Sequence, residues 1–300
     1  MSSSRSISLP DATTVGPVAL TVADLERSLD FYGKRLGFQL QERDDGRAAL
    51  GTGSGQPLLY LHKQPGARRR PTRSTGLYHY AILFPSRRDL ARALLRLAQT
   101  GTAIQGASDH LVSEAIYLAD PDGNGIEIYR DRPRSEWPRR NGQIEIGTVA
   151  LDMNDLLSVL PDEKQQPEAA EHYSLPAGTT IGHVHLHVSD LQRAEQFYRD
   201  VVGLELIMHY GNAAAFLSAG GYHHHLGLNT WAGTGAPPPP EDAVGLRWYA
   251  IRVPDAASRS ALLERLQEAG VPLQAREMGV LFHDPAQNPV LLLEATGGTK

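Results

Sequence analysis

Apolar and polar residues follow two alternating patterns that recur in a fixed order along the chain. In residues 183–188 every second side chain is apolar, which predicts a half-buried strand, and residues 17–22 occupy the same place near the N-terminus. Residues 24–36 and 190–202 have the spacing of an amphipathic helix; each begins at an Asp and ends before a Gly suited to a left-handed cap. Several short apolar stretches follow each helix. The pattern therefore predicts an α+β fold.

The predicted units are copies of one another. The matching stretches are 22–37 with 188–203, 79–85 with 248–254, and 120–127 with 284–291. Repetition at this scale predicts four βαβββ modules.

The repeats also suggest how the chain is divided. We expect a disordered segment at 1–14, a first domain of modules one and two at 15–131, and a second domain of modules three and four at 181–296. A linker at 132–180 joins them. It is too long for a tight connection, and its middle, 144–160, is expected to form a local strand and helix.

The differences between the copies indicate where chemistry occurs. Module two has His79 and Glu127 where module four has Trp248 and Leu291, and module three has His183 where module one has Pro17. A single inward-facing His is more often a satisfied core residue than a metal ligand. Two imidazoles and one carboxylate, however, form a set that suits non-haem Fe(II) and O2. We therefore predict one divalent metal on His79, Glu127 and His183, which requires modules two and three to pair or to exchange between sheets.

Composition narrows the choice of ligand and partner. The chain has no Cys, so disulfides and thiolate sites are excluded and only His, Asp and Glu remain as strong ligands. A net charge of -5, and a basic run at 67–73 without interleaved aromatics, argue against a nucleic-acid partner. No stretch approaches roughly 18 apolar residues, and residues 1–14 are polar. We therefore expect neither membrane association nor a secretory signal, and a cytoplasmic location.

Four stretches make the chain resemble the vicinal oxygen chelate (glyoxalase/bleomycin resistance/dioxygenase) superfamily. Within it, the chain looks like a type I extradiol dioxygenase, closest to the two-domain bacterial catechol 2,3-dioxygenases. The stretches are T-G-L-Y-H-Y-A-I-L (75–83), S-E-A-I-Y-L-A-D-P-D-G-N-G-I-E-I-Y (113–129), G-H-V-H-L-H-V-S-D-L (182–191) and G-G-Y-H-H-H-L-G-L-N (220–229).

The resemblance implies that the four modules form cupped mixed sheets in two domains, and it implies an activity and a role for each matching residue. The activity is Fe(II)-dependent insertion of O2 into catechol or a substituted catechol, giving a product of the 2-hydroxymuconic semialdehyde type. Mn(II) suits the same ligands, and the protein is expected to form a homo-oligomer. Many relatives keep all ligands in the second domain, whereas here both halves contribute. The implied residues are His79, His183 and Glu127 as metal ligands, His224 as acid/base, and His110 and Tyr117 as donors near substrate and oxygen.

Several alternatives stay open. A predicted strand at 223–230 puts His224 on the face of Leu226, but which of His223, His224 and His225 faces the metal is not fixed by the pattern. A glyoxalase-type isomerase or thiol transferase would need a further carboxylate on this strand, which has none. A metal-free small-molecule-binding resistance protein would not need the three ligands. Modules one and four, without ligands, are expected to form a structural domain or a subunit contact.

Overall fold

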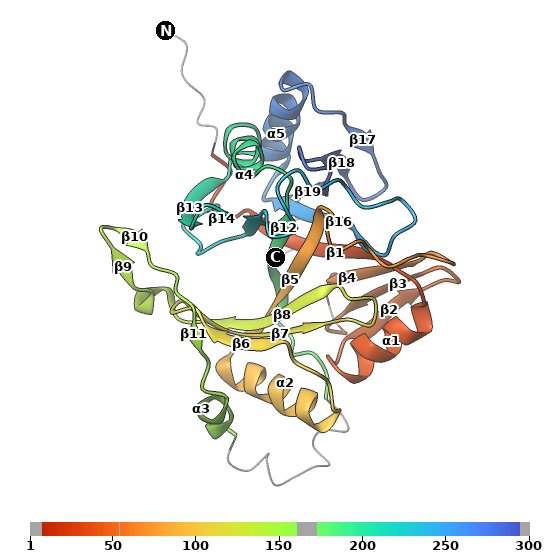
Figure 1. The fold of residues 1–300 in the computed structure, drawn as a ribbon, viewed down its shortest axis with the longest axis vertical. Helices are drawn as coiled ribbons and strands as arrows, with labels where there is room; N and C mark the ends of the chain where they lie inside the picture. The colour runs from red at the N-terminus through yellow and green to blue at the C-terminus, as the bar shows by residue number, and fades with distance from the viewer. Residues whose placement is uncertain (1–7, 54, 161–172, 295–300) are drawn as a thin grey trace.

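A computed structural model describes residues 8–53, 55–160 and 173–294 and contains two large mixed sheets (Figure 1). The eight-stranded sheet has the order β17 (Gln274–Ala275), β18 (Val280–His283), β19 (Pro289–Glu294), β16 (Gly245–Val253), β1 (Thr14–Val22), β4 (Leu59–Lys63), β3 (Arg47–Gly51) and β2 (Gln39–Arg43). The nine-stranded sheet has the order β11 (Val149–Ala150), β6 (Gly106–Asp109), β7 (Ser113–Ala119), β8 (Gly125–Asp131), β5 (Gly76–Leu83), β12 (Thr180–His187), β15 (Leu226–Asn229), β14 (Ala214–Ser218) and β13 (Glu205–Tyr210).

The sheet order confirms that the modules exchange. β1 pairs antiparallel with β16, which joins module one to module four, and β5 pairs antiparallel with β12, which joins module two to module three. Each of the predicted domains, 15–131 and 181–296, therefore gives one module to each sheet. This arrangement is the one that the prediction of a shared metal site required.

The helices lie on the sheets and begin as the sequence predicts. The Asp24 side chain accepts a hydrogen bond from the Arg27 backbone N–H at the start of α1, and Asp190 does the same for Arg193. Figure 1 places α2 along strands β6 to β8. The helices are α1 (Leu25–Lys34), α2 (Arg87–Gln99), α3 (Met153–Ser158), α4 (Leu191–Gln196, continued by a π-helical segment at Phe197–Val202) and α5 (Ala256–Glu268).

Two repeated motifs connect the sheets. The hydroxyl of Tyr32 on α1 donates to Asp120, which begins the turn before β8, at 2.9 Å. The equivalent Tyr198 donates to Asp284 at 3.1 Å. All four side chains are buried, so each helix of an odd module is tied to the Asp-Pro turn of the following even module. These bonds explain why the Phe-Tyr and Asp-Pro pairs recur together.

Two local predictions need adjustment, and a third is confirmed. Within the predicted disordered segment 1–14, residues 1–7 lie outside the described residues, whereas Leu9 is buried and its N–H donates to Gly203 O at 2.8 Å. The strand predicted at 223–230 starts only at Leu226, because the preceding histidines form an irregular turn. The linker contains the expected local structure: η1 (Arg134–Glu136), β9 (Arg139–Arg140), β10 (Gln143–Ile144), β11 and α3; residues 161–172 lie outside the described residues.

Gly182 allows a close contact beneath the β5–β12 junction. A Cβ at this position would lie 1.8 Å from the hydroxyl oxygen of Tyr129, which is buried and bonded to the Tyr222 hydroxyl at 2.7 Å. We expect Gly182→Ala to lower the free energy of unfolding by about 1–3 kcal/mol, as overpacking does. Urea denaturation measures this change. The matched variant Gly106→Ala, with no atom within 4 Å of the added Cβ, should change it by less than ~0.5 kcal/mol. Equal stabilities for the two variants would contradict the prediction.

Candidate metal centre and its cavity

Three neighbouring strands of the nine-stranded sheet each contribute one potential ligand. His79 lies on β5, Glu127 on β8 and His183 on β12, and the sheet order is β8, β5, β12. One nitrogen or oxygen atom from each residue lies within 4.8 Å of the other two. The pairing of modules two and three therefore brings together the three residues that the sequence predicted as ligands.

The geometry of the three side chains fits a metal ion. Glu127 Oε2 is 3.1 Å from both His79 Nε2 and His183 Nε2, and the side chains are almost fully buried. His79 Nε2 is buried and makes no hydrogen bond despite this distance. A buried nitrogen without a partner is costly. His79 Nε2, His183 Nε2 and Glu127 Oε2 converge on one point and form the donor set that divalent metals bind.

The protonation states also fit. Burial opposes ionisation of Glu127, but the adjacent His183 and His79 outweigh it and hold the pKa of this carboxyl well below its usual range. Burial lowers the pKa of His183. The centre therefore presents a carboxylate and a neutral imidazole, which are the forms that bind metal ions.

A cavity of about 280 Å³ opens at this centre. The walls come from both modules and from the linker, and they are largely aromatic or apolar, as in most small-molecule sites. The size suits a ligand with a single ring. The lining residues are Tyr78, His79, Ser108, His110, Val112, Ser113, Tyr117, Glu127, Ile146, Gly147, Thr148, His185, Met208, Tyr210, Phe216, His224 and Trp231.

The three consecutive histidines, His223 to His225, have different surroundings. His224 lines the cavity, and its ring centroid is 4.1 Å from that of His183. His223 turns away: its Nε2–H donates to Asp131 at 2.9 Å. His225 Nδ1 accepts a hydrogen bond from the Ser218 hydroxyl at 3.0 Å. Of the three, His224 is thus the one placed at the cavity.

When His223 is neutral, its contacts set the tautomer of His224. With its Nε2–H on Asp131, a neutral His223 has only a lone pair at Nδ1, and this atom lies 2.8 Å from His224 Nδ1. His224 Nδ1 therefore donates, and its Nε2 is left as a proton acceptor. Burial, with the neighbouring His183, holds the pKa of His224 well below its usual range, so the ring is neutral near pH 7.

His110 and Tyr117 form a hydrogen-bonded pair in the cavity wall. His110 Nδ1–H donates to the Gly147 carbonyl at 2.8 Å, so Nε2 accepts from the Tyr117 hydroxyl at 2.6 Å. Tyr117 on β7 lies across from Glu127 on β8. Burial raises the pKa of Tyr117, which keeps its hydroxyl protonated. Both residues that the resemblance pointed to therefore lie at the cavity.

Sequence reasoning did not single out His185 as part of this cavity. His185 lies opposite His79 on the paired strands, is buried, and has no hydrogen-bond partner at Nε2. A Cβ on Gly227 would lie 2.7 Å from the His185 ring, so this Gly leaves room for it. The alternation along residues 183–188 was the available signal. The aromatic walls, such as Trp231, come from segments with no comparable signal.

Comparison with known proteins agrees with this architecture. The chain is 47% identical to catechol-2,3-dioxygenase of Bacillus subtilis (strain 168) over 281 residues, 93% of this chain and 96% of the relative. Among solved structures, glyoxalase I from Zea mays is similar with a TM-score of 0.57 and 17% identity, over 94% of this chain and 92% of that one. A Bacillus subtilis structure has a TM-score of 0.64 and 16% identity, with coverages of 94% and 85%. At these identities the two structures show the shared fold alone.

A family model provides the assignment. The Glyoxalase/Bleomycin resistance protein/Dioxygenase superfamily model matches residues 14–128 and 180–286, and therefore both pairs of modules. The match covers more than half of the chain and agrees with the two curled mixed sheets described above. The chain belongs to the Glyoxalase/Bleomycin resistance protein/Dioxygenase superfamily.

Proposed function

We propose that the protein is an extradiol catechol 2,3-dioxygenase, which inserts both atoms of O2 into catechol or a substituted catechol. One observation carries this proposal: two buried histidines and a carboxylate meet at a one-ring cavity in a chain 47% identical to a catechol-2,3-dioxygenase. The carbon–carbon bond beside the diol breaks. The product, of the 2-hydroxymuconic semialdehyde type, contains all atoms of catechol and O2, so no other reductant is consumed.

His79, Glu127 and His183 would hold the metal, which we propose is Fe(II), with Mn(II) as the other ion that suits these ligands. When bound, the ion would supply open coordination positions for the diol and O2 and the redox chemistry that lets them react. Burial of the three ligands, each less than a tenth exposed, limits access of water to this point.

Side chains around the centre would accept and donate the protons that the reaction moves. His224 Nε2 is a free acceptor and can take a proton from a catechol hydroxyl, then return it when the oxygen–oxygen bond breaks. Tyr117, protonated and beside Glu127, can donate a hydrogen bond to a bound oxygen atom once it rotates from His110. The apolar walls orient the ring.

The glyoxalase-type alternative is less well supported. It would need a fourth, carboxylate ligand on the last strand of module three, and Leu226–Asn229 has none. Protein purified without air, loaded with Fe(II) and mixed with catechol tests the proposal. We expect a yellow ring-opened product and one O2 consumed per catechol, measured with an oxygen electrode. Metal-loaded protein that consumes no O2 with catechol, or that forms no ring-opened product, would contradict it.

His110 and Tyr117 should act as one unit. Because the bond to His110 Nε2 holds the Tyr117 hydroxyl at the cavity until it turns to a bound oxygen atom, we expect Tyr117→Phe and His110→Ala each to lower kcat roughly tenfold, the weight of about 1.4 kcal/mol. The double variant should lose little more than either single variant, since the same interaction is removed. Steady-state kinetics with catechol measures this. Losses that multiply in the double variant would contradict coupling.

A further inference from the structure

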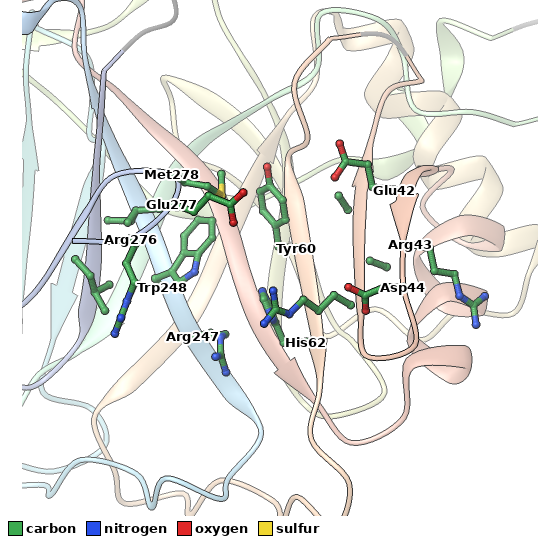
Figure 2. Close-up of a pocket in the computed structure, with 15 residues that line it drawn as sticks. Glu42, Arg43, Asp44, Tyr60, His62, Arg247, Trp248, Arg276, Glu277 and Met278 are labelled. Carbon is green, nitrogen blue, oxygen red and sulfur yellow. The ribbon is translucent and has the colours of Figure 1, made fainter. Parts of the chain in front are cut away.

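The eight-stranded sheet has a cavity of its own, about 800 Å³, larger than the one at the metal centre. Trp248 on β16 and Leu291 on β19 line it, and these residues replace His79 and Glu127 of the other sheet. Figure 2 shows this cavity between β4, β16 and the loop that precedes β18. The eight-stranded sheet, formed by modules one and four, therefore makes a second cup around a cavity, but this cup lacks the metal ligands.

Cations gather on one part of the cup. Arg247 lies on β16, Arg47 on β3 and Arg276 in the loop before β18. Within the described residues, none of the three is within ion-pair distance of a carboxylate, although Arg276 donates to Gln274 Oε1 at 2.6 Å. Burial and the positive charges of Arg47 and Arg276 disfavour the charged form of Arg247 and lower its pKa. Such a group of unneutralised arginines favours an anionic ligand.

His62 on β4 adds a neutral polar group at the same place. Burial, Arg247 and Arg47 lower the pKa of His62 to about 4, so it is uncharged near pH 7 and can donate or accept a hydrogen bond. Two acidic lining residues act on the neighbouring groups. Asp44 partly offsets the effect of the arginines on His62, and its Oδ1 also accepts the Gly46 N–H at 2.8 Å in a turn; burial and Glu42 raise the pKa of Tyr60. In Figure 2, Glu277 lies beside Met278 and Tyr60, away from Arg247.

The neighbouring wall is aromatic. The rings of Tyr60 and Trp248 lie 5.4 Å apart at an interplanar angle of 47°. Behind them, Leu281 and Leu291 are buried and belong to the same apolar cluster as Trp248. A ligand held by Arg247 would therefore place its body against two aromatic rings and an apolar floor, a combination that selects planar molecules.

We propose that the cup of the eight-stranded sheet is a second ligand site that binds a small aromatic carboxylate. Arg247 pairs with the carboxylate, as the planar guanidinium does with two oxygens, and Trp248 and Tyr60 contact the ring. A simple inorganic anion would contact the arginines but not the aromatic rings. The site is separate from the metal centre and does not depend on the proposed dioxygenase activity.

Benzoate is the probe, and isothermal titration calorimetry on the metal-loaded protein is the measurement. We expect Arg247→Gln to weaken benzoate binding at least about tenfold, because a charge-assisted pair is lost. Trp248→Leu should weaken it by a similar factor. Arg139→Gln, an exposed arginine on β9, should bind benzoate like the wild type, and catechol cleavage should be unchanged in all three variants.

Three comparisons test the assignment. Benzamide, the neutral match of benzoate, and inorganic phosphate, which lacks the ring, should both bind more weakly than benzoate. The Glu127→Gln variant should bind benzoate normally, whereas loss of binding there would place the ligand at the metal centre and overturn the proposal. No benzoate binding at millimolar concentration would also overturn it. So would dissociation of an oligomer by Arg247→Gln without an effect on benzoate, which would make the cup a subunit contact.

Discussion

Replacing Glu127 by Gln is expected to remove the metal from the protein. Gln has the same size but no charge, and Glu127 is the only anion among the three convergent donors. Changes to residues that merely support ligands weaken metal binding by roughly 10- to 100-fold, so loss of the charged ligand should exceed ~100-fold. Metal content after gel filtration, measured by mass spectrometry, should fall from about one ion per chain to near zero. Ring cleavage should disappear with it.

The control for this experiment is a carboxylate outside the centre. Glu205 on β13 is exposed, and Glu205→Gln should keep both metal and activity. Thermal unfolding without added metal separates loss of ligation from loss of fold, because metal-free wild type and Glu127→Gln should both show cooperative transitions. A Glu127→Gln protein that keeps a full equivalent of metal would refute its assignment as a ligand.

Replacing His224 by Ala or Phe should have the opposite phenotype: metal stays bound and turnover falls. Its Nε2 is the free acceptor that the hydrogen bonds through His223 to Asp131 leave available. Loss of a general acid/base typically lowers rate by about 10²- to 10⁴-fold. We expect this decrease in kcat with catechol, with metal content near that of the wild type.

His209 on β13 provides the matched control, because it is a half-exposed histidine outside the cavity lining whose Nε2 is hydrogen-bonded to Glu195 at 2.6 Å. His209→Ala should retain full turnover. The assignment of His224 fails if its variant loses metal as Glu127→Gln does. It also fails if that variant keeps full turnover while His223→Ala or His225→Ala does not.

The sequence determined the modules, the helix starts and the candidate ligands. These features are local or repeated: Asp24 and Asp190 cap their helices because the side chain bonds a backbone N–H three residues ahead. The copies differ at key positions, such as His79 in module two and Trp248 in module four. These differences predicted that one pair of modules has metal ligands and the other has none. For the same reason, the sequence required modules two and three to meet before any geometry was known.

Only the tertiary structure decided which atoms face the centre and what surrounds it. Strand alternation could not place His224, because the three histidines lie in a turn where each side chain follows its own hydrogen bonds: His223 to Asp131 and His225 to Ser218. The cavity walls come from segments far apart in sequence, such as Ile146 and Trp231. The second cup, likewise, exists only because strand pairing joins β16, β1, β4 and β3 in one sheet, so that Arg47 and Arg247 line the same cavity. Contacts between distant segments depend on packing, which no local pattern of residues encodes.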